Sequence, residues 1–78
     1  MSASTTVTAH GLNLLEACNY DRRLCGAMIA LQKENVQKEL LDSIPAGPSR
    51  RNVAVAVWQI REALGQDAAY AREITQGE

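Results

Sequence analysis

The chain has 78 residues, a formal net charge of −1 and 46% hydrophobic residues. This length fits one domain over residues 1–78, and the charge lacks the basic excess that goes with non-specific nucleic-acid binding. No apolar run reaches the ~18 residues of a membrane-spanning helix, and the start MSASTTVTAHG lacks the segments of a secretory signal, so we expect a cytoplasmic protein without membrane contact.

The first expected helix spans about residues 7–19. Thr6 or Thr8 can cap it, and residues 1–5 are expected to be loose. Its apolar stripe follows the i, i+4, i+7, i+8, i+11 spacing of an amphipathic helix: Val7, Gly11, Leu14, Leu15 and Cys18. The glycine weakens the helix but permits a close approach of another backbone.

The longest helical pattern runs over residues 21–44, and we predict one uninterrupted central helix there. Asp21 can cap it, no proline interrupts it, and Gly26 is its weak point. One apolar stripe follows its whole length: Cys25, Ile29, Val36, Leu40 and Ile44. A second stripe follows only its first half: Leu24, Met28 and Leu31. A helix covered on two sides needs two neighbours, so we expect the preceding and following helices to pack on it.

The clearest break in the chain is IPAGPS, residues 44–49, which predicts a stiff corner. A third helix is predicted over residues 49–64, with Ser49 as its cap and Gly65 as a left-handed C-terminal residue. Its stripe has helical spacing: Val53, Val57, Ile60 and Leu64. The run VAVAV could form a strand by propensity, but the chain offers no second strand to pair with it.

A short fourth helix is predicted over about residues 67–75, with residues 76–78 frayed. The expected fold class is therefore all-α, a small antiparallel bundle of three main helices with a short fourth. Because the chain has no Phe, its core must consist of Ala, Val, Leu and Ile. Such a core has a modest volume, so we expect the domain to bury more surface as a homo-oligomer, such as a homodimer.

Motifs for catalysis or cofactor binding are missing from the sequence, which has no Gly-rich phosphate loop, CxxC, HExxH or GxSxG. The single histidine, His10, has no carboxylate three or four residues further on to share a metal ion. We therefore expect no enzyme, no cofactor and no metal site. Cys18 and Cys25 are interpreted as reduced, small hydrophobes, although they could approach each other across the turn between them.

Trp58, the only tryptophan, lies more than about 90° from the centre of the third helix's stripe. One interpretation is that Tyr70 or Ile74 of the fourth helix covers it. The other is that it anchors a protein interface, where Trp is enriched. The second interpretation predicts a partner-binding face made of four residues: Val55, Trp58, Arg61 and Glu62.

Both long helices begin with a capping residue and two arginines, in Asp21-Arg22-Arg23 and Ser49-Arg50-Arg51. Cations there oppose the helix macrodipole, whereas an anion would be held by the free N–H groups and the guanidinium groups together. The candidate residues for an anion or an acidic partner are Arg22, Arg23, Arg50 and Arg51. The alternative is that arginine, a good helix former, is solvated at these positions. Antiparallel helices would put the two pairs at opposite ends of the bundle.

The function that these patterns favour is a small non-catalytic module for protein–protein interaction, which regulates or inhibits a larger protein or complex. Phages and other mobile elements often carry accessory proteins of this kind. One alternative is a nucleic-acid-binding regulator whose recognition helix opens with Ser49-Arg50-Arg51-Asn52, since Arg and Asn can read base edges. The net charge and the six-residue corner argue against it. Another alternative is a structural subunit or chaperone of a larger assembly.

Overall fold

The computed structural model describes residues 3–77, with side chains described at Ala9 and from Gly11 onward. Within this range the chain forms five α-helices and no β-strand: α1 (Ala3–Ala17), α2 (Arg22–Ala30), α3 (Glu34–Ser43), α4 (Pro48–Ala63) and α5 (Ala69–Gly77). The all-α class is confirmed. The predicted division into three main helices and a short fourth is wrong, because two helices occupy residues 21–44.

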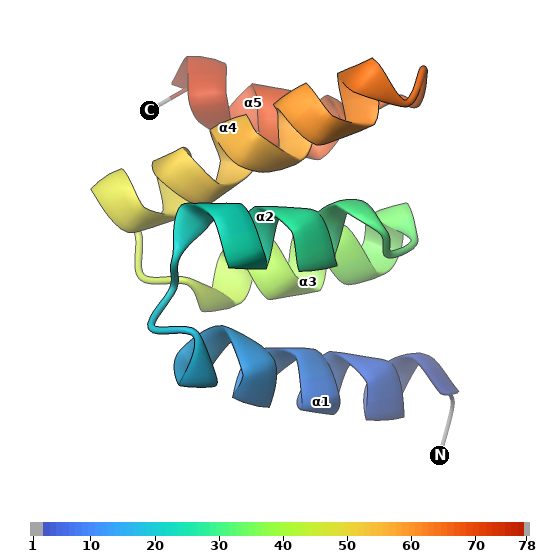
Figure 1. Ribbon diagram of the computed structural model, residues 1–78, viewed down its shortest axis with the longest axis vertical. Coiled ribbons are helices and arrows are strands. Elements are labelled where there is room, and N and C mark those ends of the chain that lie inside the picture. The colour runs from blue at the N-terminus through green and yellow to red at the C-terminus, as the bar shows by residue number, and fades with distance from the viewer. Residues whose placement is uncertain (1–2, 78) are drawn as a thin grey trace.

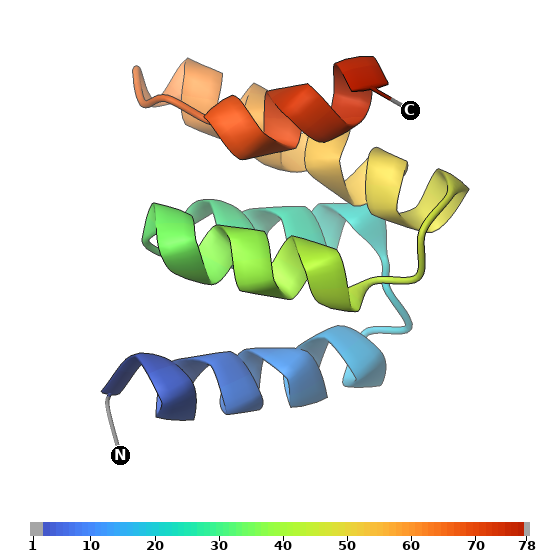
Figure 2. The ribbon, with the colours of Figure 1, turned by 180° about the vertical axis from the view of Figure 1, so that it is seen from behind.

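The helices stack in three layers, with consecutive helices running in opposite directions (Figures 1 and 2). Helix α1 forms one outer layer, α2 and α3 lie side by side in the middle, and α4 and α5 form the other outer layer. Helix α1 packs mainly on α3, and α2 packs mainly on α4. Helix α3 contacts α1, α2, α4 and α5, so residues 21–44 lie at the centre of the fold as expected, although they form two helices.

The break between α2 and α3 lies at Leu31–Lys33, where the sequence has neither proline nor glycine. Lys33 is extended, with φ −64° and ψ 155°, and ends any continuation of α2. Side chains take over two carbonyl groups that a continuous helix would have used internally. Arg61 Nη1 donates to the Ala30 carbonyl oxygen at 3.0 Å, and Gln37 Nε2 donates to the Gln32 carbonyl oxygen at 2.7 Å. Tertiary contacts therefore stabilise a break that local propensity does not indicate.

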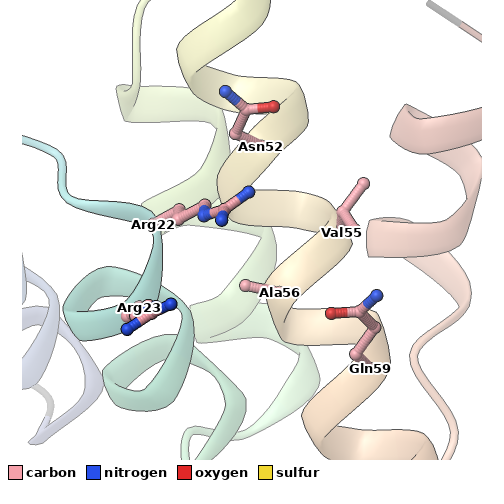
Figure 3. A pocket seen from close by; sticks show the side chains of 6 residues that line it. All are labelled: Arg22, Arg23, Asn52, Val55, Ala56 and Gln59. Atoms are coloured by element: carbon pink, nitrogen blue, oxygen red, sulfur yellow. The ribbon is translucent and has the colours of Figure 1, made fainter.

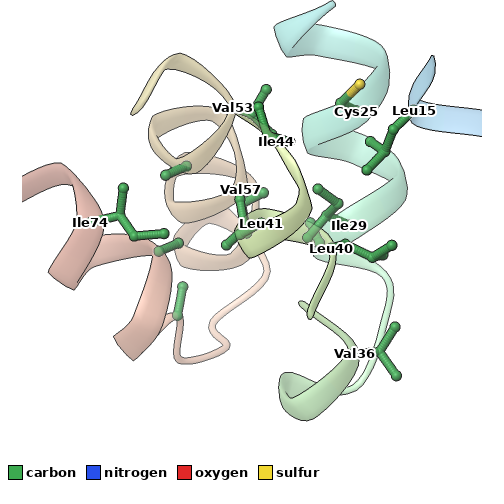
Figure 4. Close-up of a cluster of buried hydrophobic side chains, with 14 residues drawn as sticks. Leu15, Cys25, Ile29, Val36, Leu40, Leu41, Ile44, Val53, Val57 and Ile74 are labelled. Carbon is green, nitrogen blue, oxygen red and sulfur yellow. The ribbon is translucent and has the colours of Figure 1, made fainter. Parts of the chain in front are cut away.

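The break folds α3 back beside α2, so that both helices face a common core (Figure 4). The buried hydrophobic residues are Leu15, Cys25, Ile29, Ala30, Val36, Leu40, Leu41, Ile44, Val53, Ala54, Val57, Ala68, Ala71 and Ile74. All five members of the first stripe predicted for residues 21–44 are among them, although they come from α2, from α3 and, for Ile44, from the residue that follows α3. Gln37, 2% exposed, is the buried polar side chain among the described residues, and its hydrogen bond explains its position.

The second predicted stripe is covered only at Met28, so the expectation that a neighbour covers it along its length is wrong. Leu24 is 58% exposed, Leu31 is 76% exposed and Met28 is half-buried. The cause is the fold-back, because α1 packs mainly on α3 and leaves this side of α2 open to solvent. Leu64 is also exposed, at 56%, since α4 ends one residue before it.

Two of the predicted helix caps are confirmed. The Asp21 carboxylate accepts the backbone N–H groups of Arg23 and Leu24, at 3.0 and 3.1 Å. Gly65 has φ 72°, in the left-handed conformation that follows α4. The predicted cap at Ser49 is wrong, because α4 begins one residue earlier, at Pro48. Proline suits this first position, since its missing N–H has no partner within the helix.

The helix ends differ from the expectation at both chain termini. Residues 3–5 and 76–77 are helical and not loose. Met1, Ser2 and Glu78 lie outside the described residues, as do the side chains of Val7 and His10. None of the helices in this part of the chain is both long and apolar enough to cross a membrane.

Two glycines allow neighbouring helices to approach closely. A Cβ atom on Gly11 would lie 2.8 Å from Cδ2 of Leu40, so the group that approaches this glycine is a side chain and not the backbone expected there. A Cβ atom on Gly26 would lie 2.6 Å from Cβ of Ala56. Real carbon atoms do not come this close without contact strain, so Gly26 sets the spacing between α2 and α4.

Candidate partner-binding face

Helices α2 and α4 begin at the same end of the molecule (Figure 1). This follows from the break, because the added reversal at Leu31–Lys33 makes α2 and α4 run in the same direction. The expectation that the two arginine pairs lie at opposite ends is therefore wrong. Figure 3 shows Arg22 of α2 extending towards α4 near Asn52, which directly follows Arg51 in the sequence, with Arg23 further along α2.

An open hollow of about 400 Å³ lies between the two helices (Figure 3). Its lining residues are Arg22, Arg23, Asn52, Val55, Ala56 and Gln59. The arginines, Asn52 and Gln59 are exposed, whereas Val55 and Ala56 are half-buried. The hollow thus has an apolar floor and a rim of polar and positively charged groups.

Two smaller hollows continue this one along α4. One of about 300 Å³ is lined by Gly47, Pro48, Arg51 and Asn52, and one of about 350 Å³ is lined by Gln59, Glu62 and Ala63. They share Asn52 and Gln59, respectively, with the first hollow. Lining positions three or four residues apart mark a single face of a helix. We call this row of hollows the α4 trough.

Arg50 lies in the first turn of α4, but its guanidinium group forms hydrogen bonds within the protein. Its Nε donates to the Ile44 carbonyl oxygen at 3.0 Å, and its Nη2 donates to the Asp42 carbonyl oxygen at 2.9 Å. These carbonyls belong to the end of α3, which Arg50 therefore caps. The structure gives this predicted anion-site residue a structural role.

Arg61 has a similar role at the other end of α4. Besides its bond to Ala30, its Nε donates to the Asp67 carbonyl oxygen at 2.6 Å, which holds the connection between α4 and α5. The sequence interpretation placed Arg61 on the partner-binding face. In the structure its guanidinium group instead donates hydrogen bonds to the carbonyl oxygens of Ala30 and Asp67. Arg61 is therefore left out of the face.

The remaining arginines are available to a partner. Among residues 3–77, the guanidinium hydrogen bonds come from Arg50 and Arg61, while Arg22, Arg23 and Arg51 are exposed. The N–H groups at the start of α2 are already bonded to the Asp21 carboxylate. An anion at the start of α2 would thus meet guanidinium groups and not the free helix N-terminus that the sequence suggested, whereas α4 begins without a side-chain cap.

Trp58 borders the trough and is half-buried against the core. It follows the fully buried Ala54 by one helical turn and lies three residues after Val55, which lines the trough. Its position is thus intermediate between the two interpretations, core and interface. Of the four residues predicted for the partner-binding face, Val55 and Glu62 line the trough and Trp58 borders it.

The sequence interpretation missed the apolar part of this surface. Leu24, Ala27 and Leu31 are exposed on α2, the helix that carries Arg22 and Arg23. The signal was the second apolar stripe of residues 21–44, but we assigned it to the core. We call the trough together with the exposed side of α2 the α2/α4 face.

The groups with shifted pKa values lie elsewhere. Burial, and to a smaller extent the nearby Cys18 and Asp21, raises the pKa of the Cys25 thiol to about 11, so it stays protonated at neutral pH. Both cysteines are free. A hydrogen bond to the Asp42 carboxylate raises the pKa of Tyr70, and the Lys38 ammonium lies 5.4 Å from the centre of the same ring. These contacts join α5 to α3.

Within residues 3–77, no group of three or more His, Cys, Asp and Glu side chains is arranged to hold a metal ion. A comparison with models of known protein families finds no match, and searches of curated proteins and of solved structures find none.

Proposed function

We propose that this protein is a non-catalytic protein-binding module that regulates or inhibits a larger protein by occupying part of its surface. One observation carries the proposal. The α2/α4 face combines the exposed leucine side chains of α2 with exposed arginines that line a trough whose floor is apolar.

This composition agrees with the general anatomy of protein interfaces. Interfaces combine an apolar centre with a polar rim, and they are enriched in Arg and Trp. The face has an apolar stripe at Leu24 and Leu31, a rim at Arg22 and Arg23, and a half-buried tryptophan at its border. A partner that covers the exposed leucines removes their apolar surface from water, which favours binding by roughly 25 cal/mol for each Å² buried.

The positions of the shifted pKa values also support a binding function. Strongly shifted groups in a cleft are candidates for catalysis. Here neither Cys25 nor Tyr70 lines the trough, and each shift has a structural cause in core burial or in the contact between α3 and α5. The arginine, amide and apolar side chains that do line the trough are of the kinds that bind a protein surface.

The second candidate is a nucleic-acid-binding regulator, and the gathering of Arg22, Arg23, Arg51 and Asn52 at one end favours it. Two observations weigh against it. Arg50 is bonded to the end of α3, and the exposed charged residues of α3 are three acids and one lysine: Glu34, Glu39, Asp42 and Lys38. A nucleic acid that extended from the arginines onto α3 would meet repulsion between its phosphates and these carboxylates. We therefore prefer a protein partner.

Affinity capture from host lysate tests the proposal. Three baits are compared. They are the wild-type protein, a face variant carrying Arg22→Glu and Leu24→Glu, and a control carrying Arg72→Glu on α5, where the side chain is also exposed. We expect a protein retained by the wild type and the control, lost by the face variant, and stable to salt. Recovery of nucleic acid that falls steeply with salt would instead support the second candidate. Equal recovery on all three baits would contradict the proposed face.

A further inference from the structure

We infer that the α4 trough binds a helical segment of an acidic partner protein, with the carboxylates of that segment over Arg22, Arg23 and Arg51. This inference rests on the proposed function and adds the shape, charge and orientation of the bound segment.

The shape of the trough fits a helix. Its lining residues recur along one face of α4 from Pro48 to Ala63. The 16 residues of α4 correspond to a length of about 24 Å at ~1.5 Å per residue. A helix of about four turns would lie along this length, with apolar side chains at i, i+3, i+4 and i+7 on the floor formed by Val55 and Ala56.

The charges give the trough a direction. Arg22, Arg23 and Arg51 lie at the end where α2 and α4 begin, and Glu62 lies towards the other end. The positive end of the α4 macrodipole, which has no side-chain cap, adds to the arginine charges, whereas the Asp21 carboxylate offsets that of α2. The bound helix would place its carboxylates, and the negative end of its own macrodipole, at this end. It would therefore run antiparallel to α4.

A second copy of this chain does not fit the same surface. A symmetric pairing about an axis through the arginine end would place the arginines of the two copies against each other. An axis through the middle of the trough would instead place Glu62 of one copy at the arginine end of the other, which gives one carboxylate for three guanidinium groups. A head-to-tail pairing with the acidic side of α3 would build closed rings or open chains, and on that side Asp42 already accepts a hydrogen bond from Tyr70 while Lys38 adds a positive charge. The charge pattern thus favours a different, acidic protein.

Selection from a displayed library of helical peptides tests the inference. The library has four-turn helices with a fixed leucine stripe and random residues at the exposed positions. It is selected in parallel on the wild-type protein, on Arg22→Glu with Arg23→Glu, on Arg51→Glu alone, and on Arg72→Glu as the control. Circular dichroism of each target confirms that it is folded, and the single Arg51→Glu change, on a different helix, keeps the test valid if the double variant does not fold.

We expect the wild type and the control to enrich peptides with Asp and Glu at one end. A peptide selected in this way should bind at least 10-fold more weakly to either arginine variant, and NMR shifts on binding should map to Asn52, Val55 and Gln59. The inference is overturned if peptides enrich without acidic residues, if they bind the variants equally well, or if no peptide enriches. Neutral peptides whose NMR shifts still map to the trough would overturn the inference and leave the proposed function standing. The capture experiment from lysate tests the proposed function independently.

Discussion

The guanidinium group of Arg61 donates from Nη1 to the carbonyl oxygen of Ala30, 3.0 Å away and 31 residues earlier in the chain. This bond joins α4 to the last residue of α2. It satisfies a carbonyl group that the end of α2 leaves without a helical partner. Arg61 therefore helps to create the two-helix arrangement that brings the arginines of α2 and α4 to one end.

Replacing Arg61 by Ala should lower the free energy of unfolding by about 1.5–3 kcal/mol, the range for hydrogen bonds to charged groups. The physical reason is the loss of donors to two backbone carbonyl groups, those of Ala30 and Asp67. Urea denaturation measures the change. Arg51→Ala is the matched control, because that side chain is exposed and should change stability by no more than about 0.5 kcal/mol. Equal effects of both changes would contradict the capping role.

Gly26→Ala should destabilise the protein, although Ala normally improves an exposed helix position by up to ~1 kcal/mol. The added Cβ would lie 2.6 Å from Cβ of Ala56, and an overpacked contact of this kind costs about 1–3 kcal/mol. Because Cβ of Ala56 is attached directly to the backbone, it cannot rotate away. Ala56→Gly in the same protein should recover part of the loss, which a double-mutant cycle of thermal unfolding measures. Additive effects would show that the two positions do not touch.

Ile29→Ala should cost roughly 2–5 kcal/mol, the usual range for a large-to-small change in a core. Ile29 is 0% exposed and belongs to the stripe that the sequence already indicated. Leu24→Ala, on the same helix but 58% exposed, should cost much less. Chemical denaturation of both variants gives the two midpoints to compare. Similar midpoints would contradict the assignment of Ile29 to the buried side of α2 and of Leu24 to its exposed side.

Stability should fall as the pH rises from about 9 towards 11. The pKa of the Cys25 thiol is raised from 9.0 to about 11 by burial, so in this window the unfolded chain loses the thiol proton while the folded protein keeps it. The contribution is fully present below pH 9 and is lost as the pH passes the folded value. Denaturation at several pH values, with Cys25→Ala as the reference, measures it. A wild-type slope no steeper than that of Cys25→Ala would contradict this origin.

Trp58→Ala should weaken partner binding by about 2 kcal/mol or more, the level of an interface hot spot. Since Trp58 also packs against the core, the same change should lower stability, and binding must be measured under conditions where the variant is folded. Tryptophan fluorescence of the wild type should show an emission maximum between those of buried and solvated indoles. If a bound partner does not change the quenching of Trp58 by acrylamide, Trp58 is not part of the interface.

The periodicity of the sequence was enough to predict the helical class and most of the buried side chains. Cys25, Ile29, Val36, Leu40 and Ile44 are buried as predicted, because the spacing of apolar residues reflects which side of a helix leaves water, whether or not the helix is continuous. The caps at Asp21 and Gly65 were also predictable. Both depend on side-chain or backbone chemistry within one turn of the helix end.

Only the tertiary structure decided where the long helical pattern breaks and what the arginines do. The break at Leu31–Lys33 depends on hydrogen bonds from Gln37 and Arg61, and Arg61 is distant in sequence. The same break exposes the Leu24 side of α2 and brings Arg22 and Arg23 to the same hollow as Asn52. The guanidinium groups of Arg50 and Arg61 are bound by carbonyl groups at the ends of other helices, so local spacing could not distinguish them from the arginines that remain free for a partner.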